Sequence, residues 1–135
     1  MTSFALLTAS TLFGGMMLFS FGFAAFVFKA MPADQAGAVL REAFPWYYLF
    51  VVAFSALAAV VFTWVDPFSA ALLALTAASA IYARQGLMPR INRARDAQLA
   101  GDAAAKRRFG RLHGASVVLK FIQLGAIGWA LVRLI

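Results

Sequence analysis

The sequence predicts an all-α, integral membrane four-helix bundle, and three observations predict it. Of the 135 residues, 64% are hydrophobic and only 13% are charged, and the mean hydropathy is +0.84. Soluble domains contain about 45–50% apolar and about 25% charged residues, and a soluble core of this size could not bury so much apolar surface. Four apolar segments are each long enough to cross about 30 Å of hydrocarbon. Residues 1–135 are therefore predicted to form a single transmembrane domain.

The first predicted span covers residues 4–28, which contain no charged residue. Within it, Ser10 and Gly14 form a pair of small residues four positions apart, a pattern that favours close helix packing in lipid. The run is longer than the hydrophobic region of a signal peptide and no basic residue precedes it, so we expect a retained span.

A short amphipathic helix at the membrane interface is predicted after the first span. Residues 33–44 begin behind Pro32, which favours a helix start. Apolar residues then recur at helical spacing, with polar residues between them, as in helices that lie at a membrane surface. Pro45 is expected to end this helix and to begin the second span.

The second and third spans are predicted at residues 46–65 and 68–88. Aromatic residues mark both ends of the second span, as in the aromatic belts of membrane proteins: Trp46, Tyr47, Tyr48 and Trp64. Asp66 and Pro67 make a tight connection. Pro89 is expected to kink or end the third span.

A cytoplasmic helical hairpin is predicted between spans three and four. Residues 90–111 are polar and helix-prone, and Gly101-Asp102 interrupts them with a turn and a helix N-cap. The fourth span follows at residues 114–134. Short connections between four helices predict an antiparallel, up-down bundle.

The distribution of basic residues predicts the orientation. Ten of the twelve Lys and Arg residues fall in the first and third connections, whereas the side with both termini holds only Arg133. Because cytoplasmic loops carry an excess of Lys and Arg, we expect both termini to be periplasmic and the protein to lie in a bacterial inner membrane. The basic residues are expected to meet anionic lipid headgroups, and no nucleic acid partner is predicted.

One face of the fourth span is polar. His113, Ser116, Lys120 and Gln123 are spaced three, four and three residues apart, which places them on one side of a helix. One interpretation is an ion, proton or ligand site facing the bundle interior, as in a small transporter or channel-like protein. The other is a Lys120 side chain that extends to the interface beside an interfacial histidine. The sequence leaves both interpretations open.

The chain contains no recognisable catalytic or metal-binding pattern. It has no cysteine and one histidine, His113, so a zinc site lacks ligands. His113 with a methionine could ligate haem or copper, which gives a membrane redox protein as a further alternative. Since no catalytic constellation occurs, we expect a non-enzymatic protein without a cofactor.

Three segments resemble a known family: PADQAGAVLREAFPWYY, LMPRINRARDAQLAGD and RFGRLHGASVVLK. In this order they are similar to the bacterial small four-span membrane proteins of unknown function related to eukaryotic transmembrane protein 205. The resemblance implies that the family pattern includes Phe44, Pro45, Tyr48, Pro89, Asn92, Arg95, Asp96, Leu112, His113 and Ser116. Lys120 departs from it, because relatives commonly carry asparagine there.

Together these residues define a candidate functional cluster at the cytoplasmic end of the bundle. Its members are Arg41, Pro45, Tyr48, Asn92, Arg95, Asp96, His113, Ser116, Lys120 and Gln123. Within it, Arg41 is expected to pair with Glu42, or Arg95 with Asp96. The predicted function is a scaffold, accessory or interaction protein that binds a membrane-protein partner or a second copy of itself.

Overall fold

The computed structural model describes residues 1–135 and is all-α, with four long helical segments. The first consists of α1 (Thr2–Met17), the π-helical turn η1 (Leu18–Phe23) and α2 (Ala24–Ala30), and the second is α3 (Ala33–Phe62). The third consists of α4 (Pro67–Tyr82), the π-helical turn η2 (Ala83–Leu87) and α5 (Met88–Leu99), and the fourth is α6 (Ala103–Val132). All four are long and apolar enough to cross a membrane, so the chain is a multi-pass membrane protein.

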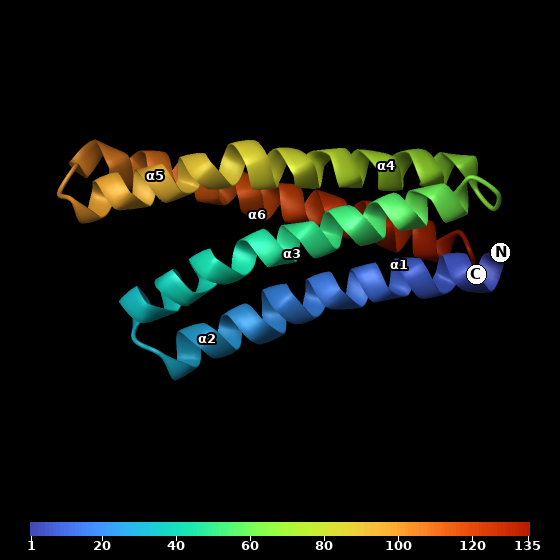
Figure 1. The fold of residues 1–135 in the computed structure, drawn as a ribbon, viewed down its shortest axis with the longest axis horizontal. Helices are drawn as coiled ribbons and strands as arrows, with labels where there is room; N and C mark the ends of the chain where they lie inside the picture. Colours follow the sequence, from blue (N-terminus) through green and yellow to red (C-terminus); the bar gives the residue numbers. More distant parts are fainter.

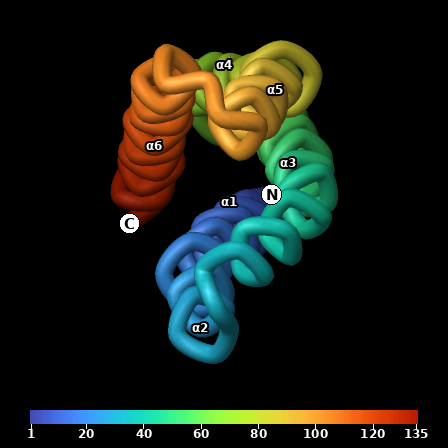
Figure 2. The backbone as a smooth tube through the Cα atoms, turned by 90° about the vertical axis from the view of Figure 1, so that its left-hand side faces the viewer, coloured from blue at the N-terminus to red at the C-terminus, as the bar shows by residue number.

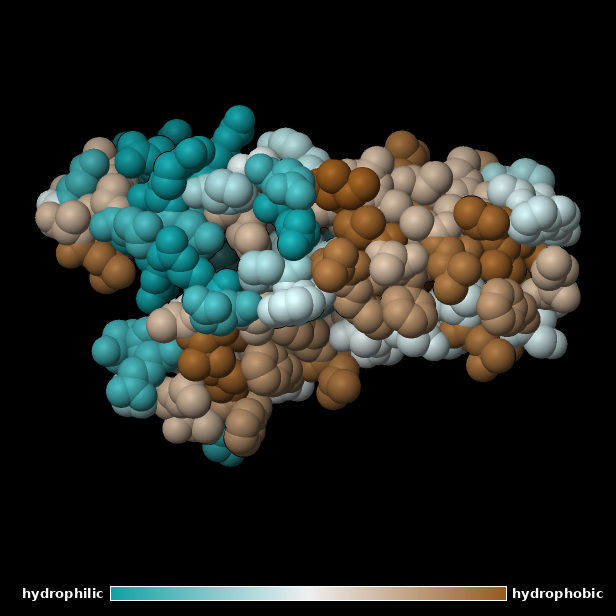
Figure 3. All heavy atoms as spheres, viewed as in Figure 1, coloured by the Kyte–Doolittle hydropathy of each residue, from teal (hydrophilic) through white to brown (hydrophobic).

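Consecutive segments run in opposite directions, as predicted for an up-down bundle (Figure 1). Both chain termini and the α3–α4 turn lie at one end of the molecule, which we call the termini end. The α2–α3 connection and the α5–α6 turn lie at the other end, the hairpin end. Hydrophilic residues gather at the hairpin end, whereas hydrophobic residues cover much of the remaining surface shown in Figure 3.

One hydrophobic core joins all four segments. Its largest fully buried side chains come from α1, α3, α4 and α6: Leu12, Met16, Val51, Phe62, Leu73 and Ile127. Other large apolar side chains point outward, among them Leu75 (65% exposed) and Ile122 (63%). Such a surface would be unfavourable in water and is expected where lipid surrounds the helices.

The hairpin end divides into two arms (Figure 2). The first arm is α2 with residues 33–45 of α3, and Val27, Ala36 and Leu40 form a small core between its two helices. The second arm is α5 with residues 103–113 of α6. Ala94 of α5 and Ala105 of α6 are both buried. Because their side chains are small, the two helices of this arm can pack closely.

The prediction that Pro45 ends a separate interfacial helix is wrong. The amphipathic segment is helical, but it forms the first turns of α3, which continues through Pro45. A proline within a helix removes one i→i−4 hydrogen bond, here to the carbonyl of Arg41. The packing of Ala36 and Leu40 against α2 holds the segment in line with the rest of α3.

Pro89 does not end the third segment either. The π-helical turn η2 lies just before it, and the Met88 N–H donates to the carbonyl of Ala83, five residues back. A widened turn of this kind lets a helix accommodate a proline ring. The helix therefore continues as α5 to Leu99 and carries the polar residues of the second arm.

The glycine that brings α1 close to α3 is Gly15 rather than Gly14. Gly14 is exposed and has open space where a side chain would lie, and Ser10 is exposed as well. At Gly15, a Cβ atom would lie 2.6 Å from the Cε1 atom of Phe50, so the Phe50 ring occupies that space. The Ser10–Gly14 pair therefore does not pack against another helix of this chain.

The turn between α5 and α6 has the predicted chemistry. Gly101 has a φ of +99°, a backbone conformation that favours glycine. Asp102 is the N-cap of α6, and its carboxylate accepts a hydrogen bond of 3.0 Å from the N–H of Ala104. The predicted helical hairpin is confirmed, with its helices continuing directly from the third and fourth spans.

Candidate functional site

An ion pair joins the two arms at the hairpin end. Arg41 of α3 donates two hydrogen bonds to Asp96 of α5, with Nη1–Oδ1 at 2.7 Å and Nη2–Oδ2 at 3.2 Å. This bidentate geometry is the strongest arrangement for a hydrogen-bonded guanidinium and carboxylate. The predicted local pairs of Arg41 with Glu42 and of Arg95 with Asp96 are wrong, because Asp96 faces the other arm.

This pairing shifts the pKa of both groups. The hydrogen bond from Arg41 lowers the pKa of the Asp96 carboxyl group, which partial desolvation opposes. The same bond raises the pKa of the Arg41 guanidinium. Both side chains remain substantially exposed, at 41% and 55%, so solvent screens the interaction. The pair therefore joins the two arms but adds little to the stability of the fold.

Two further contacts tie the second arm and η2 to α3. The guanidinium of Arg95 lies over Gly37, where an added Cβ would be 2.7 Å from its Cζ atom. Arg84 donates from Nε to the carbonyl of Pro45 at 3.2 Å. Gly37 and Arg84 were not among the predicted site residues. A local sequence pattern could not predict these two residues, because each contacts a residue about 40 to 60 positions away in the chain.

A small cavity of about 50 Å³ lies beneath the ion pair, where α3, α5 and α6 meet. Five of its lining residues belong to the predicted cluster, namely Arg41, Tyr48, Asn92, His113 and Ser116. The others are Phe44, Met88 and Ile91. A space of this size holds one or two water molecules, and the Asn92 amide and Arg41 guanidinium in its wall could bond to them.

His113 lies at the edge of this cavity. Its ring is exposed and stacks on Phe109, with the ring centroids 5.7 Å apart. Ser116 donates its hydroxyl proton to the carbonyl of His113 at 2.7 Å. Throughout the chain, no group of three or more His, Asp or Glu side chains could hold a metal ion.

Lys120 and Gln123 lie deeper and do not line the cavity. The Lys120 ammonium lies beside the aromatic rings of Phe44 and Tyr47, at 5.4 Å and 5.2 Å from their centroids, a favourable cation–π arrangement. No carboxylate is paired with it. Both Tyr47 and Tyr48 are buried in the bundle, so they are not part of an interfacial belt as predicted. Trp46 and Trp64 are exposed, in keeping with such a belt.

Gln123 makes a hydrogen bond between helices. Its Nε2 atom donates to the hydroxyl of Ser79 on α4 at 2.8 Å, and Ser79 in turn donates to the carbonyl of Thr76. Gln123 is 3% exposed, so this part of the polar face points into the bundle. The polar face thus has three environments: the exposed His113, the aromatic surroundings of Lys120 and the interhelical bond of Gln123.

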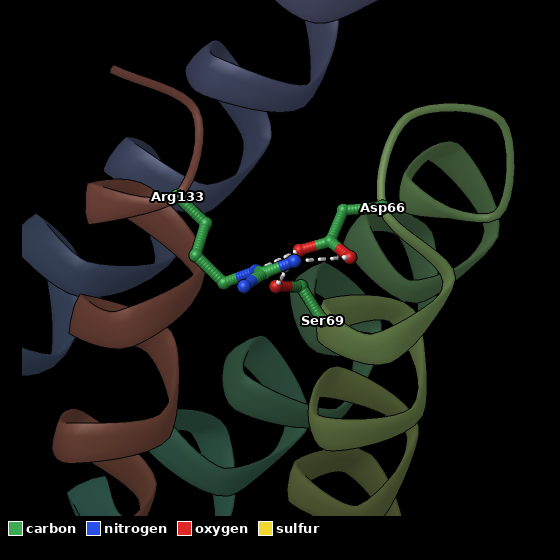
Figure 4. A network of polar contacts seen from close by, with 3 residues as sticks. All are labelled: Asp66, Ser69 and Arg133. Atoms are coloured by element: carbon green, nitrogen blue, oxygen red, sulfur yellow. Dashed lines mark hydrogen bonds and ion pairs between the residues drawn. The ribbon is translucent and has the colours of Figure 1, made fainter.

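A second ion pair, which was not predicted, lies at the termini end (Figure 4). Arg133 donates to both carboxylate oxygens of Asp66, at 2.5 and 3.3 Å, and Ser69 donates to the same carboxylate at 2.6 Å. These hydrogen bonds, Arg133 first, lower the pKa of Asp66 to about 2. The pair joins the α3–α4 turn to the end of α6.

A family described as "Domain of unknown function (DUF4149)" matches residues 7–99. No curated protein and no solved structure matches the chain. The matched residues run from α1 to the end of α5, so they include both partners of the Arg41–Asp96 pair and Asn92. His113, Ser116, Lys120 and Gln123 lie on α6, outside the match.

Proposed function

The chain belongs to the family described as a domain of unknown function (DUF4149), and we propose that it is a non-enzymatic accessory protein of the membrane. In this proposal the hairpin end is a docking surface for a partner, which is either a larger membrane protein or a second copy of the chain. The role is that of a scaffold or interaction module.

The Arg41–Asp96 pair is the observation that carries this proposal. It connects the first arm, which has a small core of its own, to the second arm, so that the two arms present one surface. The cavity beneath the pair, about 50 Å³, suits water molecules rather than an organic substrate. Rigid presentation of a surface supports binding, because less conformational entropy is lost on association.

Charge-swap variants test the proposal. Mild-detergent purification from native membranes should retain a stoichiometric partner or a defined oligomer, and Arg41→Asp or Asp96→Arg should each weaken that association. The double variant Arg41→Asp/Asp96→Arg restores the pair with reversed polarity and should recover it. Lys120→Leu is the control and should leave the association intact. A monomer free of partners, or loss of association only with Lys120→Leu, would refute the accessory role.

We further propose that the hairpin end is cytoplasmic and that the membrane is a bacterial inner membrane. Ten of the twelve Lys and Arg residues lie at the hairpin end, which supports this orientation through the positive-inside rule. A reporter that is active only in the periplasm should be active when it is fused after Ile135, and a reporter that is active only in the cytoplasm should be inactive there. Activity of a cytoplasmic reporter at that position would reverse the assignment.

The relation to eukaryotic transmembrane protein 205 is also a proposal. It is supported by three sequence segments, which contain Arg41, Asp96 and His113. The ion pair between the first two gives a specific structural test. An experimental structure of a eukaryotic relative should contain an equivalent arginine–carboxylate pair between the second and third segments, and its absence would count against the relation.

A small transporter is a second candidate, favoured by the surroundings of Lys120. Lys120 lies beside two aromatic rings and has no paired carboxylate, and an ionisable residue inside a membrane bundle is a feature of ion and proton pathways. Reconstituted vesicles would then show ion or cation flux that Lys120→Leu abolishes. Vesicles that show no flux across a broad panel of ions would eliminate this candidate.

A further inference from the structure

Three arginines surround an open pocket on the second arm. Arg90 and Arg93 of α5 and Arg108 of α6 line a space of about 460 Å³, with Ala94 and Leu112 completing the wall. We call this the arginine pocket. All three arginines are exposed, whereas Ala94 is buried beneath them.

The arginine pocket carries positive charge that the protein itself leaves almost unpaired. Neither Arg90 nor Arg93 has a carboxylate oxygen within 4.0 Å, and Arg108 has only Asp102, at 4.0 Å. Three guanidinium groups around one space repel one another unless an anion lies between them. Guanidinium groups bind phosphate oxygens through paired N–H donors, which makes a phosphate group the fitting anion.

The predicted ends of the third and fourth spans place the pocket within, or just outside, the headgroup region. Arg90 follows the predicted end of the third span by two residues, about 3 Å, and Arg108 precedes the start of the fourth by six residues, about 9 Å. The headgroup region of each leaflet is roughly 5 to 8 Å thick. A phospholipid carries its phosphate close to this depth.

A separate apolar groove lies farther along the chain's apolar part, between α4 and α6. It has a volume of about 140 Å³, and its apolar walls include Leu72, Leu75, Leu119 and Ile122. Leu75 and Ile122 are exposed, so the groove opens toward lipid. Its polar groups do not require a ligand, since Gln123 and Ser79 bond to each other.

The pocket and the groove share one face of α6. Leu112 lines the pocket, and Leu119, Ile122 and Ala126 line the groove, at spacings of seven, three and four residues. The distance from Leu112 to Ala126 along the helix is about 21 Å. This length matches one phospholipid molecule that extends from its phosphate into the hydrocarbon of a single leaflet, which is about 15 Å deep.

We propose that this chain binds one anionic phospholipid, with its phosphate group in the arginine pocket and an acyl chain in the groove between α4 and α6. The charge of the pocket selects the headgroup, and the aligned groove adds apolar contact that a free phosphate cannot use. The site does not depend on the accessory role proposed above, because it lies on the outer face of the second arm rather than between the arms.

Native mass spectrometry of the full chain tests this site. Protein reconstituted in bilayers of phosphatidylcholine with one fifth phosphatidylglycerol should retain one phosphatidylglycerol molecule after transfer to detergent. The variant Arg90→Gln/Arg93→Gln/Arg108→Gln should lower this retention by more than about tenfold. The matched control Lys106→Gln/Arg107→Gln/Arg111→Gln removes the same charge from the same hairpin outside the pocket, and should change retention by less than about threefold.

Two further measurements separate a lipid from other ligands. Ala126→Phe fills the groove without altering charge, and should reduce phosphatidylglycerol retention while the thermal unfolding of the protein is unchanged. Inorganic phosphate at millimolar concentration should not displace the lipid. Equal losses in the two charge variants, retention of phosphatidylcholine in place of phosphatidylglycerol, displacement by inorganic phosphate or indifference to Ala126→Phe would each overturn the proposal.

Discussion

Arg133, in the last turn of the chain, holds the carboxylate of Asp66 through two hydrogen bonds, although 67 positions separate the two residues. The pair fastens the end of α6 to the α3–α4 turn at the termini end. Arg133 also lies over the ring of Phe68, with its guanidinium carbon 5.8 Å from the centroid. The only basic side chain at this end is therefore fully used within the protein.

The titration of Asp66 is the first prediction. Arg133→Gln should raise the pKa of Asp66 from about 2 toward the ordinary aspartate value of about 3.9, since its main hydrogen-bond donor is lost. Because the folded-state pKa is depressed, the stabilising contribution is complete above pH 3.9 and is lost as the pH falls through about 2. Carboxyl carbon chemical shifts in micelles would measure this titration. Arg111→Gln, which removes an arginine at the hairpin end, should leave it unchanged.

The spacing of the two arms is the second prediction. Since the chain has no cysteine, spin labels can be placed specifically at Asp34→Cys on the first arm and Ala100→Cys on the second. Asp96→Asn should lengthen and broaden the measured distance distribution, because the ion pair with Arg41 is lost. Asp102→Asn should not, since Asp102 contacts only its own arm. Identical distributions for Asp96→Asn and the unmodified chain would contradict the proposed role of the pair.

The packing of α1 on α3 is the third prediction. Gly15→Leu should destabilise the protein by about 1–3 kcal/mol, because the new side chain meets the ring of Phe50. Gly14→Leu, one residue away, points into open space and should be close to neutral. Thermal unfolding of both variants in the same detergent would measure the difference. Equal effects would mean that glycine at these positions serves the helix backbone rather than the packing.

The interhelical hydrogen bond of Gln123 is the fourth prediction. A double-mutant cycle with Gln123→Leu and Ser79→Ala should give a coupling free energy of about 0.6 kcal/mol, the average for such bonds inside membrane bundles. Ser79→Ala also removes the bond to Thr76, and the cycle subtracts that contribution. A coupling free energy near zero would show that the bond does not stabilise α4 against α6.

The sequence was sufficient to predict the spans, the hairpin and the antiparallel order, because hydropathy and turn residues are local signals. Gly101 and Asp102 illustrate this, since their conformational preferences do not depend on the rest of the fold. Pro45 and Pro89 show the limit of such signals. Both are helix breakers locally, yet packing in the first case and a π-helical turn in the second keep the helix continuous.

The candidate site was predicted only in part, because local signals indicate which end of the bundle a residue occupies but not which residue it contacts. Residue type and helical spacing placed Asn92, His113 and Ser116 at one end of the bundle, and the structure groups them around one cavity. The choice of partner could not be predicted. Arg41 has Glu42 beside it in the chain and bonds instead to Asp96, because the relative rotation of α3 and α5 decides which carboxylate it meets.

That rotation has its origin in η2. A π-helical turn contains one residue more than an α-helical turn, and each residue of an α-helix turns the chain by about 100°. Deleting a single residue between Ala83 and Leu87 would therefore turn α5 by roughly a quarter of a revolution about its own axis. Asn92 would leave the cavity, Asp96 would no longer face Arg41, and Arg90 and Arg93 would move away from Arg108. The one extra residue in η2 therefore sets the rotation of α5 relative to α4. It thereby determines which side chains of α5 reach the ion pair with its cavity and which reach the arginine pocket.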